Sequence, residues 1–173
     1  MDELLVEFKL ESEEILTELL DLLEDLEEDP SQVKRLEDYG QKVGRIMGGA
    51  VSLAARGEEK VLLEQIGACA GVCKSVGYRG SQIGDRAAFA VAVIGLLLDM
   101  TETLQTMVEK VGGEQKFDLQ DPVFLTILDR LEWVSGQFGK DLRTTLDIHT
   151  PPKEANFDID EFLQRLGVNT KAQ

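Results

Sequence analysis

Two cysteines and one histidine are the side chains of this sequence that could bind a transition metal. Cys69 and Cys73 lie four residues apart in a predicted helix, whereas His149 lies far from both. Two thiolates and one distant imidazole do not make the closed ligand set of a structural zinc site. Both cysteines fall on the apolar stripe of their helix, where a free thiol behaves as a small hydrophobic side chain. We therefore interpret them as core residues and His149 as a solvated residue, and we expect no metal and no cofactor.

Carboxylates are the most numerous ionisable groups, and those of the first segment line one helix face. That face carries Glu13, Glu14, Glu18, Asp21 and Glu24. Catalysis by paired acids requires a cleft that shifts their pKa values, whereas this spacing is typical of a solvated surface. The sequence also has no nucleophile elbow, no P-loop and no dinucleotide-binding fingerprint. These observations predict a protein that is not an enzyme.

Glycines recur every four residues at Gly40, Gly44 and Gly48, and Ser52 extends this row of small residues. Each glycine inside a helix costs about 1 kcal/mol relative to alanine, so something must compensate for the row. One interpretation is that a neighbouring helix packs closely against the bare backbone. The other is that the row forms a smooth groove for the surface of a partner protein. The sequence leaves both interpretations open.

Apolar residues at spacings of three and four predict that these residues lie on amphipathic helices. The pairs Asp29-Pro30 and Asp121-Pro122 each combine an N-cap residue with a proline at the first helical position. The composition of Gly77–Ser81 predicts a loop. The predicted helices span about residues 2–28, 30–56, 58–76, 85–111 and 121–146, and a short amphipathic segment spans 157–166. We expect an all-α, antiparallel helical bundle in residues 1–148, followed by a linker and a short tail helix in residues 149–173.

The composition supports one domain with a packed core. Hydrophobic residues make up 43% of the 173 residues, and 18 basic residues stand against 33 acidic ones. The net charge of -15 repels phosphate backbones and anionic lipids. The first residues are acidic and lack the basic region of a signal peptide. The longest apolar stretch, Ala87–Leu98, is well short of the roughly 20 residues that cross a bilayer. We expect a cytoplasmic protein that binds neither nucleic acid nor membranes.

An acidic, leucine-rich segment begins at Leu10, a turn follows at Leu26–Pro30, and the run Gly-Arg-Ile-Met-Gly-Gly-Ala occupies Gly44–Ala50. Over about residues 10–111 these features resemble histidine phosphotransfer domains, most closely the amino-terminal domain of the chemotaxis histidine kinase CheA. The second helix of that family carries the pattern His-x-x-Lys-Gly-Gly-Ala. The Gly-Gly-Ala part is present here, but Gly44 replaces the phospho-accepting histidine and Met47 replaces the assisting lysine.

This departure bears on the function that the resemblance implies. Phosphotransfer needs a nucleophilic imidazole nitrogen and a cation beside the phosphoryl oxygens, and neither glycine nor a methionine thioether supplies them. The resemblance therefore implies a four-helix phosphotransfer-like core, with a fifth long helix and a tail, that keeps the shape without the reaction. It also implies a receiver domain or another chemotaxis-type signalling protein as the partner. The implied docking residues on the second helix are Gly44, Arg45, Met47, Gly48, Gly49 and Ser52.

The tail beyond Pro151-Pro152 is a second candidate interface. It resembles the acidic-hydrophobic carboxyl-terminal peptide with which the chemotaxis phosphatase CheZ binds its response regulator, a common mode of helix docking. The other interpretation is that the tail helix folds back on its own bundle. Trp133 lies off the inward stripe of the fifth helix and is either an interface anchor or covered by the tail. The apolar face of the tail consists of Phe157, Ile159, Phe162, Leu163 and Leu166.

The leading prediction is a non-catalytic protein-protein interaction module in bacterial two-component or chemotaxis-like signalling. One alternative is a response-regulator phosphatase or an unconventional phosphotransfer protein. For a phosphatase, Asp118, Gln120 and Asp121 have suitable side chains, although they lie in a predicted loop just before a proline. Another alternative is a structural homodimer in which leucine-rich faces of two chains pair.

Overall fold

The structure is a computed structural model that describes residues 1–57, 59–141 and 159–167. The described residues form helices and contain no strand, so the predicted all-α helical bundle is confirmed. A 3₁₀ helix, η1 (Pro30–Arg35), precedes α2. The α-helices are α1 (Glu3–Glu28), α2 (Leu36–Ala54), α3 (Lys60–Gly80), α4 (Ala87–Glu109), α5 (Pro122–Asp141) and α7 (Ile159–Leu166).

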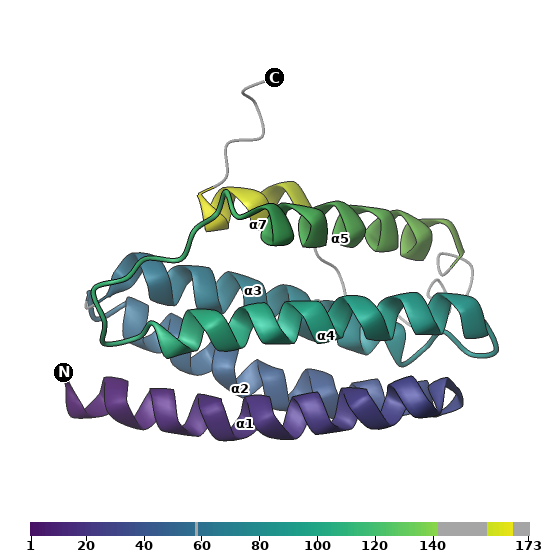
Figure 1. Cartoon of the computed structure of the whole chain (residues 1–173), viewed down its shortest axis with the longest axis horizontal. Helices are drawn as coiled ribbons and strands as arrows, with labels where there is room; N and C mark the ends of the chain where they lie inside the picture. The colour runs from purple at the N-terminus through teal and green to yellow at the C-terminus, as the bar shows by residue number, and fades with distance from the viewer. Residues whose placement is uncertain (58, 142–158, 168–173) are drawn as a thin grey trace.

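Helices α1 to α4 each run antiparallel to their neighbours and close a four-helix ring, because α4 packs against α1 as well as against α3 (Figure 1). The interior of the ring is filled by aliphatic side chains, such as Leu16 and Leu23 of α1 and Leu97 and Leu104 of α4, which solvent does not reach. Outside the ring, α5 packs on α4 and α7 packs on α3. These two helices form a second layer on the side away from α1 (Figure 1).

Helices α2 and α3 approach each other closely because α3 presents glycines to side chains of α2. A Cβ atom built on Gly67 would lie 3.2 Å from Cγ2 of Val51. A Cβ atom built on Gly71 would lie 3.3 Å from the sulfur of Met47. Bare backbone on one helix thus accommodates side chains of the other, and this packing compensates for the low helix propensity of glycine.

The prediction of a loop at Gly77–Ser81 is wrong, because α3 continues as a helix to Gly80. A Cβ atom on Gly77 would lie 2.8 Å from Cδ1 of Tyr39, and one on Gly80 would lie 2.7 Å from Cδ1 of Leu36. Both α2 side chains are completely buried. The glycines therefore serve contact between helices rather than a turn, and the buried apolar area offsets their conformational cost.

Both Asp-Pro pairs begin helical segments, as predicted. Asp29 Oδ1 accepts hydrogen bonds from the backbone N–H and the hydroxyl of Ser31. The segment that begins at Pro30 is nevertheless the 3₁₀ helix η1, because Gln32 departs from helical φ and ψ. The α-helix begins only at Leu36, which corrects the prediction of one helix over residues 30–56. At the second pair, Asp121 Oδ1 accepts a hydrogen bond of 2.8 Å from the N–H of Val123 at the start of α5.

Helix α4 is apolar around most of its circumference because neighbours cover it on several sides. An 18-residue segment of this helix, longer than the Ala87–Leu98 stretch, is apolar enough to cross a membrane by length and hydropathy alone. Half of that segment is buried inside the bundle, where α4 contacts α1, α3 and α5. The helix ends at Glu109, shortly before Gly112, whose φ of +80° suits a residue without a side chain.

The second layer is held by the apolar stripes of α5 and α7. The stripe that the apolar spacing predicts for α5, Ile127, Leu131, Val134, Phe138 and Leu142, is confirmed for its first four residues, and Leu142 lies outside the described residues. His149, predicted to be solvated, also lies outside them. In α7, Phe162 and Leu166 are buried against the bundle and Leu163 packs on the same core. The structure thus shows the tail helix on its own bundle. Phe157 lies outside the described residues, and docking of the tail on a partner stays a prediction. The buried stripe of α5 consists of Ile127, Leu131, Val134 and Phe138.

Candidate functional site

The residues predicted for docking on α2 point in three directions, and two of them face α1. The guanidinium of Arg45 forms an ion pair with the carboxylate of Glu11, while most of its side chain stays exposed. A Cβ atom built on Gly49 would lie 2.9 Å from Cδ2 of Phe8, which is buried. Gly49 is therefore a packing residue between α2 and α1, and Arg45 links the two helices at their surface.

Two further residues of the predicted site face α3. A Cβ atom built on Gly44 would lie 3.4 Å from Cδ and Cε of Lys74 and 3.5 Å from its Nζ. The Met47 side chain is half-buried, and its sulfur rests over the backbone of Gly71. The position that the family resemblance assigns to a phospho-accepting side chain is thus covered in part by a lysine of the next helix.

Gly48 and Ser52 are exposed to solvent, as Arg45 is. Gly48 is exposed, and a Cβ atom built on it would meet no atom within 4 Å. Ser52 is exposed one turn further along, and Arg45 precedes Gly48 by three residues. Because residues three and four apart share a helix face, Arg45, Gly48 and Ser52 form a continuous exposed strip. We call these three residues the open strip of α2.

The glycine row therefore combines the two interpretations that the sequence left open. Gly40 packs under the ring of Tyr78, whose carbons would lie 3.2 Å from its Cβ, and Gly44 lies under Lys74. Gly48 packs under nothing. The first two glycines of the row therefore pack against α3, whereas Gly48 exposes bare backbone.

Lys74 is the residue near this site that the sequence analysis missed. It is half-buried on α3, and its ammonium group lies 5.9 Å from the centroid of the Tyr78 ring. The regular recurrence of glycines on α2 indicated that something covers them, but not which side chain. With Arg45, Lys74 brings positive charge to this region of a protein whose net charge is -15.

Cations of α2 and of the preceding η1 also form ion pairs with carboxylates of α1. The ammonium of Lys42 lies 2.8 Å from Glu18 Oε2, and the guanidinium of Arg35 lies 3.4 Å from Asp25 Oδ2. The hydrogen bond from Lys42 lowers the pKa of the Glu18 carboxyl, and the same bond raises the pKa of Lys42. Exposed pairs of this kind stabilise a fold only weakly, so they mainly orient the two helices.

The remaining candidate residues lie in the core or make local contacts. Cys69 and Cys73 are free and buried in the core, as predicted. Within the described residues, no group of three His, Cys, Asp or Glu side chains is arranged to hold a metal ion. Asp118 Oδ1 accepts a hydrogen bond of 2.9 Å from the N–H of Gln120, while Asp121 caps α5. The carboxylates considered for a phosphatase are thus bonded to nearby backbone.

Trp133 lies on the surface of α5, with 55% of its area exposed. Its ring meets the buried ring of Phe89 on α4 edge to face, with centroids 6.3 Å apart. The described part of the tail leaves more than half of the tryptophan uncovered, so its role as an interface anchor stays a prediction.

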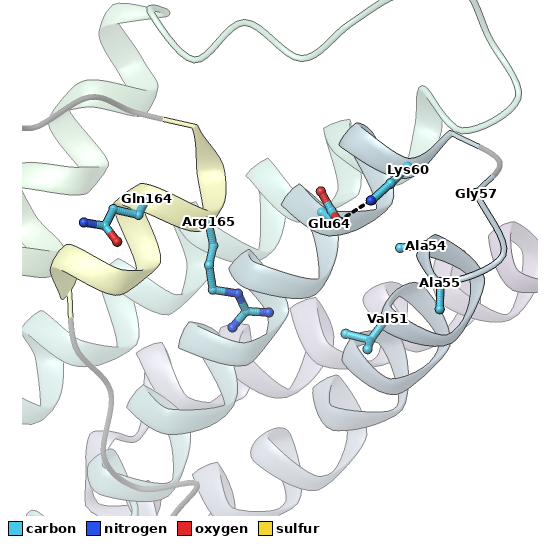
Figure 2. A pocket seen from close by; sticks show the side chains of 8 residues that line it. All are labelled: Val51, Ala54, Ala55, Gly57, Lys60, Glu64, Gln164 and Arg165. Carbon is cyan, nitrogen blue, oxygen red and sulfur yellow. Dashed lines mark ion pairs between the residues drawn. The ribbon is translucent and has the colours of Figure 1, made fainter.

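Two hollows open at the end of the bundle where α3 begins. Figure 2 shows the first, of about 610 Å³, with Arg165 reaching from α7 toward α2 and α3. In its wall Lys60 and Glu64 form an ion pair of 3.9 Å. The second hollow, of about 520 Å³, lies between the start of α3 and the chain that leads to α5. The first is lined by Val51, Ala54, Ala55, Gly57, Lys60, Glu64, Gln164 and Arg165.

No protein-family model, no curated protein and no solved structure matches this chain. The resemblance to histidine phosphotransfer domains therefore stays a prediction that depends on the run Gly44–Ala50 and its place in the second helix.

Proposed function

We propose that this protein is a non-catalytic interaction module of bacterial two-component or chemotaxis-like signalling, which docks a receiver domain or a related partner through α2. The observation that carries the proposal is the open strip of α2, in which Gly48 exposes helix backbone with no atom within 4 Å of its Cβ position. A partner can approach such a surface more closely than one covered by long side chains. The antiparallel ring of α1 to α4 supports the proposal, since it holds α2 between α1 and α3 with its exposed face outward.

The surroundings of Gly44 and Met47 favour binding over phosphotransfer. Phosphotransfer requires an imidazole where Gly44 lies and a cation beside it. The Met47 sulfur instead packs over Gly71, and the stem of Lys74 lies beside Gly44.

The test uses receiver domains encoded in the same genome as this chain, each purified and titrated by calorimetry. We expect at least one receiver domain to bind the wild-type protein and Gly48→Trp to abolish that binding. The bundle should tolerate the tryptophan because its Cβ meets no neighbour. Far-UV circular dichroism should therefore give the same helix content for the variant and the wild type.

Gly136→Trp on α5 is the matched control, because Gly136 is also exposed and has no atom within 4 Å of its Cβ position. This variant should bind like the wild type. The proposal fails if no receiver domain binds the wild-type chain, or if a folded Gly48→Trp variant binds with unchanged affinity.

A phosphatase and a structural homodimer are the competing functions. Adding the chain to a phosphorylated receiver domain should leave the rate of dephosphorylation unchanged, whereas acceleration would favour the phosphatase. Light scattering should give the mass of a monomer, and a dimer would favour pairing of the chain with itself. The net charge of -15 opposes such pairing.

A further inference from the structure

We draw no further inference here: the strongest candidate, the 520 Å³ hollow between the start of α3 and the chain that leads to α5, has in its wall the Glu59 carboxylate, one oxygen of which is buried without a hydrogen-bond partner among the described residues, but solvent does not reach that oxygen and the lining mixes lysine and glutamate side chains, so nothing in the structure shows what ligand the hollow would take.

Discussion

The phenol of Tyr39 on α2 and the hydroxyl of Thr101 on α4 form a hydrogen bond of 2.8 Å at a place that solvent does not reach. The Thr101 hydroxyl also donates to the carbonyl oxygen of Leu97 over 2.6 Å. Because threonine has only one hydroxyl proton, Tyr39 must be the donor in the first bond. The two bonds join α2 to α4 across the bundle and satisfy polar groups that would otherwise be buried alone.

This arrangement predicts an asymmetry between two substitutions. Thr101→Val removes the acceptor of the buried Tyr39 hydroxyl, which should lower the free energy of unfolding by roughly 1–3 kcal/mol. Tyr39→Phe removes the donor but leaves the bond from Thr101 to Leu97, and should cost about 1 kcal/mol. Urea unfolding of both variants measures the difference. Equal losses, or a larger loss for Tyr39→Phe, would contradict this assignment of the donor.

Stability should also fall at alkaline pH. Burial raises the pKa of the Tyr39 phenol well above its ordinary value, and a hydrogen bond with Cys73, together with burial, raises the pKa of the Cys69 thiol. Both groups are neutral in the fold, so their contribution is complete below the unfolded-state pKa values and is lost as the pH rises toward the folded ones. The free energy of unfolding should therefore decline above about pH 8.5 and more steeply above about pH 10.

Substitutions separate the two contributions to this alkaline loss. Tyr39→Phe should remove the steeper part of the decline, and Cys69→Ala should remove the part that begins at lower pH. Urea titrations at a series of pH values measure both slopes. A slope that is the same in both variants and in the wild type would show that other groups cause the loss.

The adjacent glycines Gly48 and Gly49 should respond oppositely to alanine. Gly48 has no atom within 4 Å of its Cβ position, so alanine there should stabilise the helix by about 0.5–1 kcal/mol. Alanine at Gly49 would bring its Cβ to 2.9 Å from the buried ring of Phe8 and should cost about 1–3 kcal/mol. Thermal unfolding should place the Gly48→Ala variant above the wild type and Gly49→Ala below it. The reverse order would mean that α1 and α2 are packed in another register.

A lysine of α1 caps backbone carbonyl groups at the C-terminal end of α4. The ammonium of Lys9 donates to the carbonyl oxygens of Glu109 and Val111, over 2.7 and 3.2 Å. Lys9→Met keeps the apolar stem but removes the donor from these carbonyl groups, so it should cost about 1 kcal/mol of stability. Lys60→Met is the control, since Lys60 is exposed and forms a surface ion pair with Glu64, and its effect should be smaller. Urea midpoints of both variants make the comparison, and an equal effect would contradict the capping role.

The sequence was sufficient for features that depend on neighbouring residues. The Asp-Pro pairs at Asp29 and Asp121 begin helical segments because a carboxylate accepts hydrogen bonds from N–H groups two residues later in the chain. Apolar spacing likewise predicted the buried stripe of α5, since one helix face repeats every three to four residues.

Features that depend on distant contacts could not be derived in the same way. The apolar spacing of the tail predicts an amphipathic helix, but its place on α3 depends on the hydrogen bond from Gln65 and on the burial of Phe162 and Leu166, which no local pattern encodes. Lys74 covers Gly44 only because α2 and α3 pack with a particular register. The Gly-Gly-Ala run predicted both Gly48 and Gly49 as docking residues. In the structure Gly48 is exposed, whereas Gly49 packs against Phe8 of α1.

The helical stretch around Gly77 gives the sharpest test of this difference between local and distant effects. Local propensity favours alanine over glycine inside a helix by about 1 kcal/mol, so Gly77→Ala should stabilise an isolated α3. In the protein its Cβ would lie 2.8 Å from the ring of Tyr39 and 3.2 Å from the carbonyl oxygen of Leu36, which is backbone and cannot rotate away. Overpacking of this kind costs about 1–3 kcal/mol, so the variant should unfold at lower urea than the wild type. Gly136→Ala, which meets no atom within 4 Å, should unfold at higher urea. A stabilised Gly77→Ala variant would contradict the close packing of α2 on α3.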